Sequence, residues 1–139
     1  MQERYYLDTS VWIDVYEDRK GYNGEPLGEY GSRLLAYLLE TGMSIIITDC
    51  LIKELETKYA MEEILGMLKP FESLIERSIL NEKQRTEARR VSLERGIPYG
   101  DALHAIAARD LKCILITRDK HFLRLKDISE PKTPEYFLS

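Results

Sequence analysis

The stretch SIIIT, residues 44–48, decides the fold. Three consecutive β-branched residues favour a strand, and the lack of polar alternation predicts that both of its faces are buried. The stretch CILIT, residues 113–117, repeats this pattern, and YYL, residues 5–7, is a shorter apolar run. Strands buried on both faces are typical of parallel sheets covered by helices on each side. We therefore expect these three strands at the centre of an α/β fold.

Helical patterns separate the strands. Helices are expected near residues 11–16, near 34–39 with Gly42 at the C-terminal end, at 49–59, at 61–69, from an Asn81 cap to Arg95, and at 102–111. The glycine-rich stretch 21–31 and the turn 98–100 are interpreted as loops, a fourth strand is expected within 74–80, and a helical turn at 121–125. This order predicts a three-layer sandwich, with a central mostly parallel sheet flanked by helices. A single domain is expected over residues 1–139.

The composition is that of an ordinary globular protein, with 44% hydrophobic and 32% charged residues. A net charge of -4 is not typical of a nucleic-acid-binding protein. It decides little, because a carboxylate cluster that binds cations adds negative charge to the sequence while the cations reverse the local field. Cys50 and Cys113 lack the spacing of a metal or redox motif and are expected to be buried thiols at sheet positions. No apolar run resembles a signal peptide or a membrane span, so we expect a cytoplasmic protein without membrane contact.

Four acidic residues fall at the junctions of the expected elements. Asp8 ends the first strand, Glu54 lies about one helical turn after the second, Asp119 follows the third, and Asp101 begins the small-residue helix. In an open parallel sheet, ligand sites form beyond the carboxyl ends of the strands. Each acid also has an ordinary alternative: the three aspartates suit helix N-caps, and Glu54 suits an ion pair with Lys58.

Only the convergence of the four acids calls for a special explanation. Carboxylates within a few ångströms of one another repel, so some would stay protonated unless a cation lies between them. An all-oxygen site without histidine or cysteine suits Mg²⁺ or Mn²⁺ rather than zinc. Such ions bind phosphodiesters and lower the pKa of a bound water so that it attacks phosphorus.

The acids lie in four blocks that carry a resemblance. YLDTSVW, IITDCLIKEL, PYGDALHAIAA and ILITRDKHF follow one another between Tyr5 and about Phe122. In order and spacing they resemble the PIN-domain family, and VapC-type toxin ribonucleases in particular. The resemblance implies that Asp8, Glu54, Asp101 and Asp119 are catalytic ligands of Mg²⁺ or Mn²⁺, and that the protein hydrolyses RNA phosphodiester bonds. It also implies a homodimer that an antitoxin protein holds inactive.

Neighbouring polar residues are expected to support these acids. Thr9 and Thr117 match hydroxyl residues that the family places beside them, with helix capping as the open alternative. His104, three residues after Asp101, is a candidate partner of a carboxylate or phosphate, although histidines at such positions commonly serve packing. His121 is interpreted as a surface or packing residue, and Trp12 and Tyr16 as core or dimer-interface residues. The residues expected to contact the RNA backbone are Lys53, Lys58, Arg109, Arg118 and Lys120, whereas Arg85, Arg89 and Arg90 are interpreted as a solvated helix face.

Two other functions remain open from the sequence. A non-catalytic RNA-binding or adaptor module of PIN-like fold would keep the fold without cutting RNA. A phosphoacceptor receiver domain also places acids at strand ends, with Asp49 as the residue that would be phosphorylated. It would need an acidic pair after the first strand and a lysine directly after the last, and Asp8 stands alone while Lys120 comes after Asp119.

Overall fold

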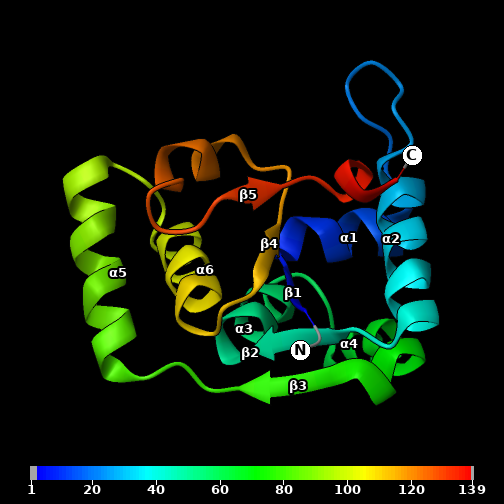
Figure 1. The fold of residues 1–139 in the computed structure, drawn as a ribbon, viewed down its shortest axis with the longest axis horizontal. Coiled ribbons are helices and arrows are strands. Elements are labelled where there is room, and N and C mark those ends of the chain that lie inside the picture. The colour runs from blue at the N-terminus through cyan, green and yellow to red at the C-terminus, as the bar shows by residue number, and fades with distance from the viewer. Residues whose placement is uncertain (1–2, 139) are drawn as a thin grey trace.

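The structure, a computed structural model, describes residues 3–138 as three layers around a parallel sheet (Figure 1). The strands are β1 (Arg4–Leu7), β2 (Ser44–Thr48), β3 (Ile75–Ser78), β4 (Ile114–Ile116) and β5 (Pro131–Lys132). The α-helices are α1 (Thr9–Glu17), α2 (Leu27–Thr41), α3 (Asp49–Glu56), α4 (Met61–Leu68), α5 (Glu82–Arg95) and α6 (Tyr99–Asp110). Three 3₁₀ helices are η1 (Lys69–Leu74), η2 (Lys120–Leu125) and η3 (Pro134–Phe137). The predicted α/β sandwich is confirmed.

The strands lie in the order β3-β2-β1-β4-β5, and every neighbouring pair is parallel. Strand β1 is therefore central, between β2 and β4. In the receiver-type order 2-1-3-4-5, the first strand lies instead between the second and the third. The receiver interpretation is thus wrong.

Successive residues of the central strands point into two separate cores. Tyr5 and Leu7 of β1 pack in one core with residues of α1, α2, α3 and α4, whereas Tyr6 packs in the other with α5, α6 and η2. Figure 1 shows α5 and α6 on one side of the sheet and α1 and α2 on the other. This alternation is the period-2 geometry of a strand, and burial of both faces explains the continuous apolar runs.

Several boundaries differ from the sequence prediction. Helix α2 begins at Leu27, so the expected loop ends earlier, because Gly28 and Gly31 serve close packing against α1 rather than a turn. Helix α6 begins at Tyr99, three residues before the expected start, which places Asp101 inside the first turn instead of at the N-cap. Strand β5 was not expected, since it consists of two residues and begins with a proline at the sheet edge.

The two cysteines also differ from expectation. Cys50 lies in α3 rather than in the sheet, and Cys113 precedes β4; both are only partly buried. Among residues 3–138, no helix combines the length and the apolar character that crossing a membrane requires.

The contact between α1 and α2 gives a test of packing. A Cβ atom on Gly31 would lie 2.5 Å from Val15 Cγ2, whereas one on Gly66 of α4 would meet no atom within 4 Å. We expect Gly31→Ala to lower the free energy of unfolding by about 1–3 kcal/mol, because the helices must move apart. The matched Gly66→Ala variant should raise it by up to about 1 kcal/mol, as alanine has the higher helix propensity. Urea denaturation measures both, and equal effects would contradict the packing argument.

Candidate metal centre

Asp8 lies at the carboxyl end of β1 and is 4% exposed. Its backbone N–H donates to the Ile116 carbonyl of β4, at 2.9 Å, so its position continues the sheet. Its carboxylate does not cap α1. Instead, Oδ2 accepts hydrogen bonds from the hydroxyls of Thr117, at 2.8 Å, and Ser10, at 2.9 Å. The capping alternative is therefore wrong for Asp8, and two hydroxyls hold its carboxylate at the sheet edge.

Glu54 of α3 faces the same edge. Its Oε1 accepts hydrogen bonds from the Thr9 hydroxyl and from His104 Nε2, the latter at 2.6 Å. Burial raises the pKa of the Glu54 carboxyl, but these donors outweigh burial and hold the pKa below its usual range. The expected ion pair with Lys58 is absent from the described residues, where Lys58 pairs with Glu17 at 3.0 Å.

Gly100 leaves room for the Glu54 side chain. A Cβ atom at position 100 would lie 2.3 Å from Glu54 Oε2, so any larger residue would displace this carboxylate. The backbone of α6 thus approaches Glu54 closely because the first turn of that helix contains a glycine.

Asp101 and Asp119 form the other half of the site, with His121 between them. His121 Nδ1 lies 2.9 Å from Asp101 Oδ2 and 3.0 Å from Asp119 Oδ1. Asp119 also caps η2, accepting from the His121 backbone N–H at 2.9 Å. Burial, followed by the charges of Asp119 and Asp8, raises the pKa of Asp101 to about 6, against the opposing effect of His121. Three of the four acids therefore act on one another.

His104 of α6 lies between Asp8 and Glu54 and contacts both carboxylates through Nε2. It is fully buried, its Nδ1 makes a hydrogen bond with the Tyr6 hydroxyl, and its Nε2 lies 3.9 Å from Asp8 Oδ1. Burial lowers the pKa of the imidazole, but the polar groups of Tyr6, Cys50 and Glu54 outweigh burial and raise it well above its usual value. The predicted contact between His104 and a carboxylate is thus present, and so are those of Thr9 and Thr117.

Sequence reasoning missed three of these contacts. Ser10 was not singled out, although a hydroxyl two residues after a strand-end aspartate can reach back to it. Tyr6 was counted only as an apolar strand residue. His121 was expected on the surface, and it is 52% exposed, yet its ring lies between two acids. Its position could have indicated this contact, because His121 follows Asp119 by two residues and lies in the first turn of η2.

The expected RNA-contacting residues are placed very differently from one another. Arg109 lies at the opposite end of α6 from Asp101 and pairs with Glu87 at 2.7 Å. Arg118 pairs with Glu135, next to the site. Like Lys58, both arginines are thus occupied. Within residues 3–138, Lys53 and Lys120 have no ion-pair partner, and each is close in sequence to a proposed ligand.

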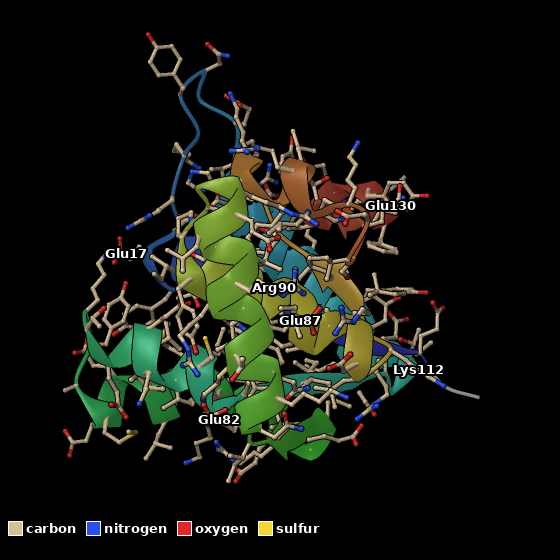
Figure 2. All side chains as sticks on the ribbon, turned by 90° about the vertical axis from the view of Figure 1, so that its left-hand side faces the viewer. Glu17, Glu82, Glu87, Arg90, Lys112 and Glu130 are labelled. Carbon is tan, nitrogen blue, oxygen red and sulfur yellow. The ribbon has the colours of Figure 1, made fainter. Side chains whose placement is uncertain are left out.

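Helix α5 fits the interpretation of a solvated face. Figure 2 shows Glu82 and Arg90 on this helix, and both side chains are exposed. Its arginines pair with acids: Arg85 with Asp49, Arg89 with Glu82, and Arg90 with Glu94. Asp49 in addition accepts a hydrogen bond from the Leu80 backbone N–H, at 2.9 Å. Asp49 is therefore a structural residue that ties α3 to the segment after β3.

The donor chemistry fits a divalent cation such as Mg²⁺ or Mn²⁺. Ligand atoms of Asp101, Asp119 and His121 lie within 4.8 Å of one another, and after burial it is the charges of Asp119 and Asp8 that raise the pKa of Asp101. A hard cation would relieve this repulsion through the oxygen donors that it prefers. The group differs from the expected all-oxygen set in the nitrogen of His121.

The raised pKa of Asp101 predicts an unusual dependence of stability on pH. Its folded-state pKa, about 6, lies above the ordinary aspartate value of 3.8, so folding is favoured below pH 4 and this contribution is lost as the pH rises through 6. In metal-free protein, Asp101→Asn should therefore raise the free energy of unfolding at pH 7–8 by about 1–3 kcal/mol. Urea denaturation with a chelator, from pH 4 to 8, measures this.

A control of opposite sign is available in Asp127. A hydrogen bond from Arg95 lowers the pKa of this carboxyl, so Asp127→Asn should lose stability above the ordinary aspartate pKa. Stability profiles of Asp101→Asn and wild type that run parallel across the pH range would contradict the proposed repulsion.

Comparison with known proteins gives a consistent result. A family model described as "PIN domain" matches residues 5–128. A chain of the VapBC2 structure from Rickettsia felis, bound to a DNA fragment from its promoter, is similar with a TM-score of 0.67 and 19% identity, covering 94% of this chain and 98% of that one. A chain of a toxin–antitoxin complex from Klebsiella pneumoniae has a TM-score of 0.58 and 18% identity, covering 94% and 97%. A protein from Pyrobaculum aerophilum has a TM-score of 0.60 and 18% identity, covering 98% and 87%.

At these identities the solved structures establish a common fold. A search of curated proteins found no significant match. The family model spans β2, β3, β4, most of β1 and all four acidic positions. The chain therefore belongs to the PIN domain family.

Proposed function

We propose that this protein is a metal-dependent endoribonuclease that hydrolyses RNA phosphodiester bonds with Mg²⁺ or Mn²⁺. The observation that carries the proposal is that His104 links Asp8 to Glu54, that His121 links Asp101 to Asp119, and that the charges of Asp8 and Asp119 act on Asp101. Membership of the PIN domain family supports the same function. Two of the similar structures are described as VapBC or toxin–antitoxin complexes, which also favours a nuclease toxin.

In this proposal the four acids hold the metal directly or through water. When bound, the metal lowers the pKa of the attacking water and stabilises the charge that develops on the phosphate oxygens. Thr117 and Ser10 orient Asp8 through its Oδ2, and Thr9 and His104 orient Glu54 through its Oε1. These hydrogen bonds fix the carboxylates before substrate arrives, so little reorganisation is needed during the reaction.

The same geometry suggests how the substrate lies. Lys53 of α3 lines a surface pocket together with Glu54, and Lys120 of η2 lines another together with Asp119, so each lysine lies near a proposed ligand. We propose that they contact the phosphates on either side of the cut bond. Arg118 and Lys58 would have to leave their carboxylate partners to do so.

Loss of the acids should abolish cleavage. Purified protein with Mn²⁺ should cut single-stranded RNA, and Asp8→Asn and Asp101→Asn should each lower the rate by about 100-fold or more, since each removes a proposed metal ligand. Asp127→Asn, which makes the same change on the exposed surface, should cleave at the wild-type rate. Gel analysis of a labelled RNA with and without chelator measures this.

The same assay tests the adaptor alternative. If wild-type protein with either metal binds the RNA in a mobility-shift experiment but cuts none, the non-catalytic module becomes the better description. If Asp8→Asn and Asp101→Asn cut as fast as wild type, the site is wrongly placed.

We further propose that the nuclease acts in the cytoplasm as the toxin of a toxin–antitoxin pair, and that it forms a homodimer. The solved relatives described as toxin–antitoxin complexes support the partner. Helices α1 and α2 each offer an exposed aromatic residue to such an interface, Tyr16 at 46% and Tyr37 at 42%, whereas Trp12 is 1% exposed and belongs to the core.

The partner can be tested from the genome and by co-purification. We expect a small reading frame beside this gene whose product, when co-expressed, co-purifies with the protein and suppresses RNA cleavage. Light scattering of the protein alone should give the mass of a dimer. A neighbouring product that neither binds nor inhibits would contradict the toxin proposal while leaving the nuclease intact.

A further inference from the structure

A second group of metal donors lies beside the acidic site and differs from it in chemistry. Ligand atoms of Cys50, Glu54 and His104 lie within 4.8 Å of one another. His104 Nε2 is 3.9 Å from Cys50 Sγ and 2.6 Å from Glu54 Oε1. We propose that these three residues form a second cation site, selective for Zn²⁺-like ions, whose occupation takes Glu54 away from the acidic site.

The donor set favours zinc over the cations of the acidic site. Thiolate, imidazole and carboxylate are the usual protein ligands of Zn²⁺, whereas Mg²⁺ takes oxygen ligands. Asp8 Oδ1, which is 3.9 Å from His104 Nε2, would supply a fourth ligand. The four donors then comprise one sulfur, one nitrogen and two oxygens.

The distances suit a tetrahedral ion after a small adjustment. Zinc–ligand bonds of about 2.0–2.3 Å place neighbouring donors about 3.3–3.8 Å apart. The separations of His104 Nε2 from Cys50 Sγ and from Asp8 Oδ1, both 3.9 Å, are near this range. The 2.6 Å hydrogen bond between His104 and Glu54 must open, as the ion replaces the shared proton.

The surroundings of His104 resemble those of a metal-binding histidine. Such a residue usually donates a hydrogen bond from its second ring nitrogen, which fixes the ring and its tautomer. Here His104 Nδ1 contacts the Tyr6 hydroxyl, and the Tyr6 oxygen lies 2.8 Å from Thr48 Oγ1. With Nδ1–H donating to Tyr6 and Tyr6 donating to Thr48, Nε2 presents its lone pair to the ion once it has released the proton that it donates to Glu54.

An entry path leads to these donors. A surface pocket of about 250 Å³ is lined by Cys50 and Glu54 together with residues of α5 and α6. Lys53 and Arg85 also line it, and Arg85 is neutralised by Asp49. Zn²⁺ binding releases protons: the Cys50 thiol loses its proton as the Zn–S bond forms, and a protonated His104 Nε2 loses its proton as the Zn–N bond forms.

The consequence for activity rests on the proposed function. Glu54 and Asp8 cannot serve both cations fully, so Zn²⁺ at the second site would inhibit the nuclease. Excess Mg²⁺ would not restore activity efficiently, because it competes poorly for a thiolate and an imidazole.

The test uses Co²⁺, which reports thiolate ligation by a charge-transfer absorption in the near ultraviolet. We expect the purified, reduced protein in saturating Mg²⁺ to develop this absorption with one Co²⁺ per chain, and Zn²⁺ to abolish it. Cys50→Ser should lose the absorption and weaken Zn²⁺ binding, measured against a chelating indicator, by at least about tenfold.

Cys113→Ser is the matched control. Burial raises the pKa of the Cys113 thiol to about 11, and its Sγ contacts the Leu111 carbonyl at 3.6 Å, so it stays protonated. This variant should keep both the absorption and the Zn²⁺ affinity of wild type. Circular dichroism confirms that both variants fold.

The outcomes separate the two proposals. An absorption that persists in Cys50→Ser, or no absorption in wild type, overturns the second site whatever the nuclease assay shows. An absorption lost only in Cys50→Ser supports the site even if no RNA is cut. In an active nuclease, Zn²⁺ inhibition that is relieved by Cys50→Ser, while cleavage with Mn²⁺ stays within about twofold of wild type, supports the link through Glu54.

Discussion

Strand β1 is hydrogen-bonded on both sides, by β2 and by β4, and the candidate site depends on this constraint. The backbone N–H of Asp8 donates to Ile116 of β4, so the residue cannot shift without breaking the centre of the sheet. Because all five strands are parallel, the segments that follow β2 and β4 leave at the same edge. Thr48 is the last residue of β2 and Thr117 the first after β4; the Thr48 hydroxyl forms a hydrogen bond with Tyr6, and the Thr117 hydroxyl donates one to Asp8. The sheet thus brings its polar residues together without any loop having to fold back.

The energetic difficulty of the site is the repulsion between one buried carboxylate, that of Asp8, and three partly buried ones. It is reduced by a different donor at each acid: hydroxyls at Asp8, an imidazole and a hydroxyl at Glu54, and the exposed imidazole of His121 between Asp101 and Asp119. Part of the repulsion remains, because the charges of Asp119 and Asp8 add to the effect of burial in raising the pKa of Asp101 to about 6. A site that keeps such repulsion in a folded protein is one that gains stability when a cation binds, since the cation interacts with the folded state alone.

The sequence predicts those features of the fold that nearby residues determine, and not those that depend on contacts between distant segments. The strands 44–48 and 113–117 were predictable, because burial on both faces leaves an uninterrupted apolar run. The start of α6 was not, because Tyr99 and Gly100 look like a turn and become helical only through packing beside Glu54. The partners of Arg109 and Arg118 were equally hidden: Glu87 lies on another helix, and Glu135 lies 17 residues further along the chain. Local sequence shows that a charge is present, and only the fold shows whether it is free.

Glu54 shows why the site should be regarded as two neighbouring environments rather than one acidic cluster. Towards Asp101 and Asp119 the donors are mainly oxygen and partly open to solvent, which suits a hydrated hard cation. Towards Cys50 and His104 they are sulfur and buried nitrogen, held by Tyr6 and Thr48 in the second core. Glu54 lies between the two, and Gly100 leaves its carboxylate room. Glu54 can act with either set of partners. A hard cation such as Mg²⁺ would keep its carboxylate with Asp101 and Asp119, whereas a softer cation such as Zn²⁺ would bind it together with Cys50 and His104.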